Sequence, residues 1–201
     1  MNIYLVRHGA TGWNAENRVQ GRIDTSLNEK GRQQAVFCRN YFKNIPLTVT
    51  YSSPLKRARH SAEIIVESRC PIIICDDLTE RDFGNWEGKL WTEVMPELEC
   101  RKIRDGVKLR PTNGESLEEL VVRSQRILKD IISKHNEGEN ILLVSHGGPI
   151  RSIIGLALGI SYEQIPSLGE IPNCSITLLL YQNGLLRPAF LNHQPKSGDS
   201  Q

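Results

Sequence analysis

The sequence has little excess charge of either sign and no long hydrophobic run. Its 201 residues include 25 Lys+Arg and 23 Asp+Glu, so the formal net charge is only +2. This balance argues against nucleic acid or an anionic membrane as the main partner. No segment approaches the roughly 20 consecutive apolar residues that cross a bilayer. Residues 1–9 also lack the basic and apolar regions of a signal peptide.

Motifs of several other protein classes are missing. The five cysteines are odd in number and form no C-x-x-C pair, which indicates reduced thiols in a cytoplasmic protein. No G-x-S-x-G nucleophile elbow accompanies His146-Gly147-Gly148, which excludes an α/β-hydrolase esterase. Neither G-x-x-x-x-G-K-[ST] nor G-x-G-x-x-G occurs, which argues against a nucleotide-binding module.

Six apolar segments predict β-strands. Four are hydrophobic throughout and rich in β-branched residues, as expected for strands covered on both faces. These four are Ile3–Val6, Leu47–Tyr51, Pro71–Cys75 and Ile141–Val144. Gln182-Asn183-Gly184 predicts a hairpin turn between two final strands, Ser175–Tyr181 and Leu185–Leu191.

Helical patterns alternate with the first four strands. They cover Asn28–Phe42, a segment capped by Ser53 and opened by Pro54, Ser116–Lys134 with a Ser116/Glu119 capping box, and Gly147–Leu158. This alternation predicts a single α/β domain with a mainly parallel central sheet flanked by helices on both faces. We assign residues 1–192 to this domain and residues 193–201 to a flexible C-terminal tail.

Two predicted strands end in the same dipeptide. Ile3–Val6 leads into Arg7-His8-Gly9, and Ile141–Val144 leads into Ser145-His146-Gly147-Gly148. Ligands of open α/β sheets bind beyond the carboxyl ends of the strands, so we expect the two imidazoles to face each other there. A single histidine at a strand end is more often structural, whereas two in matched positions favour a functional site. The glycines allow backbone N–H groups to approach an anion, although they also suit a tight strand-to-helix turn.

Basic and acidic residues near these strand ends fit phosphoryl transfer. Arg57 lies in the first turn of a predicted helix, where a cation is favourable if an anion binds nearby; a surface salt bridge explains it equally well. The loop Leu78–Gly88 holds three carboxyl groups, and Glu80 is only weakly preferred over Asp82 and Glu87 as a general acid. Phosphoryl transfer needs cationic donors, an in-line nucleophile and a proton for the leaving oxygen. Neutral histidine is a suitable nucleophile.

Several segments, in order along the chain, resemble the histidine phosphatase (phosphoglycerate mutase-like) superfamily. They are Leu5-Val6-Arg7-His8-Gly9 with Thr11, Trp13-Asn14, Asn17-Arg18 and Gly21, then Leu27–Ala35, Ser52–Ala58, Leu78–Gly88 and Val144–Gly147. Asn113-Gly114-Glu115-Ser116 also matches the branch with short phosphatases. The resemblance extends from Ile3 to about Leu191, and the motifs are specific in combination rather than singly.

The resemblance implies a role for each matching residue. His8 is phosphorylated, Arg7, Arg57 and His146 enclose the phosphate, and Glu80 protonates the leaving group and later helps to activate water. Further substrate contacts are assigned to Asn14, Gln20, Gly21, Arg81 and Gly147. The family needs no metal, and the sequence holds no H-E-x-x-H or clustered ligand motif. We therefore expect neither a metal nor another cofactor.

Three features favour a phosphatase over a phosphoglycerate mutase. Mutases of this superfamily carry a longer segment after the acid loop, with adjacent arginines for the substrate carboxylate. Here Trp91–Pro111 is short and holds no Arg-Arg pair. Phe83 replaces the tyrosine of the mutases, and Trp86-Glu87-Gly88 resembles the phosphatase branch. The expected partner is a small-molecule phosphomonoester, such as α-ribazole phosphate, phosphoserine, or a sugar or glycerate phosphate.

Alternatives stay open at this level. They are a cofactor-dependent phosphoglycerate mutase and a non-catalytic phosphate-binding protein, although the latter predicts a lost nucleophile, arginine or acid. The basic stretch Arg101–Arg110 is interpreted as a solvated helix end or loop, with guidance of an anionic substrate as the alternative. Arg81 and Lys89 are candidates for holding a carboxylate or second phosphate. A homodimer and a monomer are both compatible with the sequence.

Overall fold

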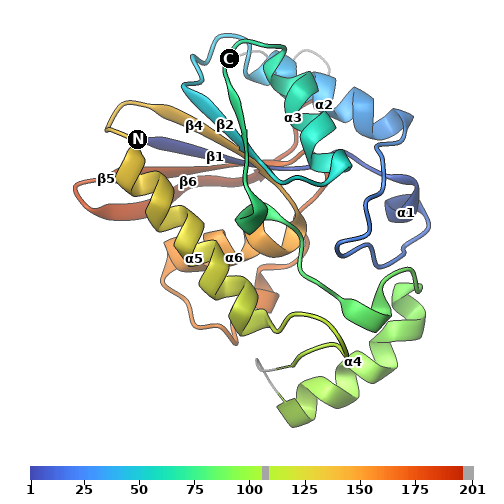
Figure 1. Cartoon of the computed structure of the whole chain (residues 1–201). Coiled ribbons are helices and arrows are strands. Elements are labelled where there is room, and N and C mark those ends of the chain that lie inside the picture. The colour runs from blue at the N-terminus through green and yellow to red at the C-terminus, as the bar shows by residue number, and fades with distance from the viewer. Residues whose placement is uncertain (106–108, 197–201) are drawn as a thin grey trace.

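The computed structural model describes residues 1–105 and 109–196, which build a layered α/β structure around one sheet (Figure 1). The strand order is β3-β2-β4-β1-β5-β6. The strands are β1 (Asn2–Arg7), β2 (Val49–Ser52), β3 (Ile72–Ile74), β4 (Asn140–Ser145), β5 (Ile176–Gln182) and β6 (Leu185–His193). The first four run parallel, and the β5–β6 hairpin pairs antiparallel with β1. The predicted fold class is confirmed, as a mixed sheet that is parallel in four of its strands.

Side-chain alternation along β1 divides the core into two layers. Ile3 and Leu5 pack in a cluster with apolar residues of α5 (Leu117–Lys134) and α6 (Gly147–Leu158). Tyr4 and Val6 point to the opposite face, towards α2 (Glu29–Tyr41) and α3 (Lys56–Val66). The pleat turns successive residues to opposite faces, so an apolar run without alternation fits a sheet covered on both sides.

Two local predictions are wrong. Residues 71–75 were expected to form a fully buried strand, but β3 is a three-residue edge strand in which Ile73 is 45% and Ile74 is 47% exposed. Among the described strands only β2 pairs with it, so β3 lies at the edge of the sheet, where these two side chains are about half exposed. The second error concerns α3, which begins at Lys56 with Leu55 as its N-cap and no side-chain cap. Ser53 lies two residues before the N-cap, where its hydroxyl accepts a 3.3 Å hydrogen bond from the Leu55 N–H and also contacts His146.

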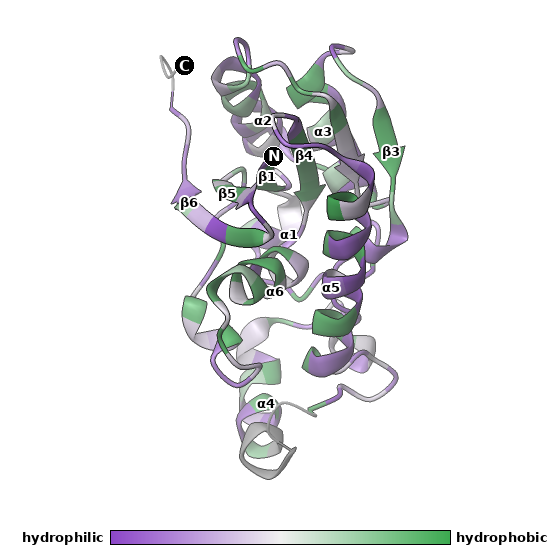
Figure 2. Ribbon diagram, turned by 90° about the vertical axis from the view of Figure 1, so that its left-hand side faces the viewer, coloured by the Kyte–Doolittle hydropathy of each residue, from purple (hydrophilic) through white to green (hydrophobic). Residues whose placement is uncertain are grey.

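The capping prediction for α5 is confirmed. The Ser116 hydroxyl accepts a hydrogen bond from the Glu119 N–H, and the Glu119 carboxylate accepts one from the Ser116 N–H. α5 is amphipathic along its length (Figure 2). The box therefore sets the start of a helix whose buried side packs against the sheet.

A helix that was not predicted, α4 (Trp91–Asp105), lies beyond the carboxyl ends of the strands (Figure 1). It packs through Val94 in a small third cluster with Val19, Trp86 and Leu109. The predicted basic stretch begins in this helix, and residues 106–108 lie outside the described part of the chain. A smaller helix, α1 (Gly12–Ala15), stands at the same end of the sheet. These additions build walls around the strand ends.

The C-terminal boundary differs slightly from the prediction. β6 extends to His193, whose ring lies 5.4 Å from that of Tyr41. This residue was assigned to the tail, of which residues 197–201 lie outside the described part. Within the described residues, no helix has both the length and the apolar composition that a membrane crossing demands.

Candidate active site

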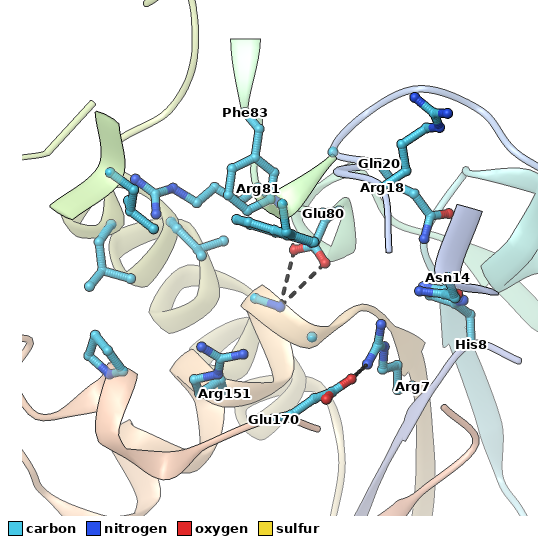
Figure 3. A pocket seen from close by; sticks show the side chains of 18 of the residues that line it. Arg7, His8, Asn14, Arg18, Gln20, Glu80, Arg81, Phe83, Arg151 and Glu170 are labelled. Atoms are coloured by element: carbon cyan, nitrogen blue, oxygen red, sulfur yellow. Dashed lines mark hydrogen bonds and ion pairs between the residues drawn. The ribbon is translucent and has the colours of Figure 1, made fainter. Parts of the chain in front are cut away.

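A cavity of about 470 Å³ opens where β1 and β4 end (Figure 3). The two strands are in register, with Arg7 opposite Ser145, so the residues that follow them meet. The His8 and His146 ring centroids are 5.0 Å apart. The cavity is also walled by segments near α1, by the loop after β3, and by α4, α5 and α6. The sequence-based expectation that the two histidines face each other is confirmed.

His8 is held with one ring nitrogen free for chemistry. Its Nδ1 lies 2.7 Å from the Gly9 carbonyl oxygen, and a carbonyl only accepts, so Nδ1 carries the proton and Nε2 the lone pair. The side chain is almost completely buried. Burial, followed by the positive charges of Arg57 and Arg7, holds the pKa of His8 well below 6.5. His8 is therefore a neutral imidazole at physiological pH.

His146 supplies a buried donor on the other side. It is the N-cap residue of α6 and has no solvent exposure. Its Nε2 lies 2.8 Å from the Ser53 hydroxyl oxygen, whereas Nδ1 has no hydrogen-bond partner among the described residues. Burial, followed by the positive charges of Arg57 and Arg7, lowers the pKa of His146 well below 6.5. A bound anion would reverse that charge environment.

Arg57 and Arg7 both line the cavity and place positive charge near His8. Arg57 is fully buried and donates to the carbonyls of Ile23 (2.8 Å) and Gly21 (2.7 Å). Burial lowers its pKa to about 10, which leaves it charged at neutral pH. Arg7 donates to the Ile171 carbonyl and pairs with Glu170 at 3.2 Å. The Nε of each arginine is buried and lacks a partner among the described residues.

These unpaired donors indicate an anion site. A buried donor without a partner costs roughly 1–3 kcal/mol, and three of them, Arg7 Nε, Arg57 Nε and His146 Nδ1, belong to the residues around His8. Oxygen atoms of an oxyanion would satisfy all of them. The positive charge of the arginines and the N-terminus of α6 favour the same ligand.

Of the three carboxyl groups in Leu78–Gly88, only Glu80 lines the cavity. Its carboxylate accepts from the N–H of Arg81 at 2.8 Å and of Gly148 at 3.1 Å (Figure 3). The other two stabilise loops: Glu87 accepts from the Arg22 N–H, and Asp82 accepts from the Gly84 N–H. The structure thus resolves an ambiguity of position that the sequence left open.

The five predicted contact residues all line the cavity. The Asn14 Oδ1 accepts from the Thr11 N–H and hydroxyl, which directs its amide nitrogen elsewhere. The Gln20 Oε1 is likewise occupied, by the hydroxyls of Thr11 and Thr25. Gly21 has a φ of +52° and offers its carbonyl to Arg57, so its visible contact is structural.

The remaining two predicted contact residues differ in what they offer a ligand. Gly147 is the first residue of α6 and leaves its surroundings open, since an added Cβ would meet nothing closer than 4.0 Å. The Arg81 guanidinium is engaged: it donates to the Glu115 (2.9 Å) and Leu109 (2.8 Å) carbonyls and lies 5.5 Å from the Phe83 ring centroid. Arg81 therefore supports the wall of the cavity as well as lining it.

Sequence reasoning missed a buried ion pair behind Glu80. Arg123 and Glu115 form two hydrogen bonds, of 2.7 and 3.0 Å, and both side chains are 10% exposed. Arg123 also donates to the backbone carbonyls of Asp77 and Glu80, so the pair fixes the loop that carries Glu80. A signal was available, because Arg123 falls on the apolar side of the predicted helix, between Leu120 and Ile127.

Arg151 and Glu170 were also missed, and both line the cavity. Arg151 lies one turn into the helix opened by His146-Gly147-Gly148, a placement that resembles that of Arg57. Glu170 comes from the segment between α6 and β5, which carried no sequence signal. Over the described residues, no group of three or more His, Cys, Asp or Glu side chains is arranged to hold a metal ion.

The fold and the cavity together define a protein of the phosphoglycerate mutase-like class, with an oxyanion site at the strand ends. The chain belongs to the histidine phosphatase superfamily (branch 1), whose family model matches residues 3–194. The family resemblance seen in the motifs is confirmed, and so is assignment to an enzyme superfamily with phosphatase members.

Proteins similar in sequence include some named as phosphatases and others named as phosphoglycerate mutases. The chain is 38% identical to the metal-independent phosphoserine phosphatase of Arabidopsis thaliana over 184 residues, 88% of this chain and 75% of that one. It is 37% identical to the probable phosphoglycerate mutase GpmB of Enterobacter sp. (strain 638) over 190 residues, 90% and 86% of the two chains. Similarity of sequence alone therefore does not separate a phosphatase from a mutase.

A solved structure shows the same fold along nearly the whole chain. The α-ribazole phosphatase from Shigella flexneri superposes with a TM-score of 0.87, covering 97% of this chain and 98% of that chain at 26% identity. The phosphatase members among the relatives and neighbours thus act on chemically different leaving groups, according to their names.

Proposed function

We propose that the protein is a metal-independent phosphomonoester hydrolase that works through a phosphohistidine intermediate on His8. The observation that carries the proposal is the ring of unpaired buried donors around a neutral imidazole whose Nε2 is free. Such an arrangement suits a nucleophile next to a phosphoryl group whose oxygens are held by Arg7, Arg57 and His146. Asn14 and Gly147 add contacts from the cavity wall.

In the first step, the lone pair of His8 Nε2 attacks phosphorus and the P–O bond to the leaving group breaks. Glu80 lines the same cavity and, as a carboxylic acid, gives its proton to the leaving oxygen, so that an alcohol departs. In the second step, water attacks phosphorus, Glu80 accepts one proton from that water, and the P–N bond breaks. Inorganic phosphate and neutral His8 are regenerated.

Small phosphomonoesters are the proposed substrates, with α-ribazole phosphate, phosphoserine, and sugar or glycerate phosphates as candidates. A cavity of about 470 Å³ accepts molecules of this size. We further propose a cytoplasmic enzyme with no nucleic-acid or membrane partner, in keeping with the net charge of +2. Gln20, Gly21 and Arg81 are proposed to shape the cavity.

The test is phosphate release from this panel and from an aryl phosphate, with and without chelator. The His8→Ala variant should lose turnover by roughly 10⁴-fold or more, whereas His60→Ala, outside the cavity, should behave as the wild type. Wild-type activity should resist the chelator, and denatured enzyme should retain labelled phosphate on His8. Activity that requires added metal, or that persists in His8→Ala, would contradict the mechanism.

A phosphoglycerate mutase is the second candidate, because a relative with that name is 37% identical. Incubation of 3-phosphoglycerate with its bisphosphate primer separates the two: a mutase forms 2-phosphoglycerate faster than it releases phosphate. A non-catalytic phosphate-binding protein would bind phosphate but neither turn over nor become labelled at His8.

A further inference from the structure

Arg151 differs from the other arginines that line the cavity. Arg7, Arg18, Arg57 and Arg81 each donate to a backbone carbonyl, and two of them also meet a carboxylate. Arg151 makes no hydrogen bond or ion pair with any residue that the structure describes, and its buried Nε is unpaired. The charged guanidinium of Arg151 therefore lines the cavity without a hydrogen-bond partner among the described residues.

The position of Arg151 relative to Glu80 indicates which part of a substrate it would contact. Glu80 is bound to the N–H of Gly148, and Arg151 follows Gly148 by three residues on α6. In Figure 3, His8 and Arg151 lie on opposite sides of Glu80. If the phosphoryl group sits at His8 and Glu80 serves the leaving oxygen, the rest of the leaving group extends towards Arg151.

The surroundings of Arg151 favour one kind of ligand group. Apolar side chains of α5 and the segment after α6, among them Leu117, Leu120 and Pro166, line the same cavity. Desolvation lowers the pKa of Arg151, while the carboxylates of Glu80 and Glu170 raise it without pairing with it. One planar guanidinium matches one carboxylate with two parallel hydrogen bonds. The two nearby carboxylates make a doubly charged phosphate less favourable there.

We propose that Arg151 is a specificity-determining residue that binds a carboxylate on the leaving group of the substrate. This inference rests on the proposed phosphatase function and narrows its substrate class to phosphomonoesters of hydroxy-carboxylic or hydroxy-amino acids. The site differs from a pair of adjacent arginines after the acid loop, which this chain lacks, because it is built on α6. It acts on substrate choice and leaves the phosphoryl chemistry to His8 and Glu80.

Matched substrate pairs test the proposal, because each pair differs only at the carboxylate. They are phosphoserine against phosphoethanolamine, and 3-phosphoglycerate against glycerol 1-phosphate. The wild type should prefer the carboxylate member of each pair. Arg151→Met should lower kcat/KM for that member by roughly 10- to 100-fold and change the other member and an aryl phosphate by less than about threefold. Arg151→Lys keeps the positive charge but not the planar guanidinium, so its kcat/KM for the carboxylate member should lie between those of the wild type and Arg151→Met.

Arg59→Met is the matched control, since Arg59 is exposed on α3 and pairs with Glu63 outside the cavity. Equal losses of Arg151→Met on both members of a pair would overturn the proposal and make Arg151 a positioning residue for Glu80. The proposal would also be overturned if the wild type preferred fructose bisphosphate to fructose 6-phosphate but showed no preference within the carboxylate pairs, because Arg151 would then bind a second phosphate. Wild-type hydrolysis of the aryl phosphate without any pair preference refutes only this inference; no hydrolysis at all refutes the proposed function as well.

Discussion

The Gly148→Ala substitution tests whether the position of Glu80 controls catalysis. Gly148 donates its N–H to the Glu80 carboxylate at 3.1 Å. A Cβ added at Gly148 would overlap Glu80 Oε1 and approach Leu120 Cδ2 to 3.2 Å. The carboxylate must therefore move by roughly 1 Å to reach ordinary van der Waals contact. Misplacement of a catalytic group by this amount costs on the order of 10²-fold in rate.

The loss should depend on the leaving group. An alkyl phosphate needs the proton of the general acid, whereas an activated aryl phosphate leaves readily without it. We therefore expect kcat for an alkyl phosphate to fall about 100-fold, with a loss of less than about fivefold for an aryl phosphate. Glu80→Gln should show the same pattern. Steady-state kinetics on both substrates, with rapid-quench measurement of labelled His8, provides the assay.

Two controls separate this effect from damage to the fold. Gly12→Ala places the same methyl group at the start of α1, where an added Cβ meets nothing within 4 Å, and it should leave both rates unchanged. Gly148→Ala itself should keep its Tm, because the overlapping oxygen is the end of a movable side chain and alanine favours a helix. Equal losses on alkyl and aryl phosphates would refute Glu80 as the acid that Gly148 positions.

Two further predictions concern stability. Since burial and nearby charge hold the pKa of His8 and of its ring neighbour well below 6.5, the unfolded chain binds protons that the folded chain excludes once the pH falls below 6.5. The free energy of unfolding should then fall by roughly 1 kcal/mol per histidine per pH unit. Urea titrations at several pH values between 7 and 5 should therefore show that this free energy depends less steeply on pH in His8→Asn than in the wild type. The same pH dependence in both proteins would contradict the lowered pKa. Arg123→Leu removes the closest ion-pair partner of buried Glu115 and leaves, among the described residues, only the longer contacts to Arg22 at 3.8 Å and to the Asp82 N–H at 3.3 Å. The free energy of unfolding should fall by about 3 kcal/mol, more than for Arg59→Leu on the surface. Equal stability of the two variants in thermal unfolding would show that the pair contributes nothing.

The meeting of the two histidines was predictable because it depends on short-range sequence patterns and one rule of topology. Apolar runs before Arg7-His8 and before Ser145-His146 specify strands, and parallel strands bring their carboxyl ends to one edge. No knowledge of loop geometry was needed to place two imidazoles together. The position of Arg57 could be predicted for the same reason, since it lies at the start of a helix that follows β2 at that edge.

The walls of the cavity were less predictable, because they depend on longer-range packing. The apolar spacing of Trp91, Val94 and Leu98 is helical, but Pro96 inside the segment argues against a helix. In the structure, α4 spans this segment and Pro96 lies in its second turn. A proline there removes only one backbone hydrogen bond, to Thr92, and packing around Val94 outweighs that cost.

The first turn of α6 explains why the reaction class can be inferred more readily than the substrate. His146, the proposed hydrogen-bond donor to phosphate, and the N–H of Gly148 that binds Glu80 are positioned by the point at which the backbone leaves β4. Arg151 is one turn further along α6 and also lines the cavity. We therefore expect a substitution at position 151 to change what the leaving group contacts, while the hydrogen bond from Gly148 to Glu80 stays in place. If Arg151 selects the leaving group as proposed, substrate choice depends on a side chain one turn beyond the strand-end motif, and that motif alone predicts the reaction class but not the substrate.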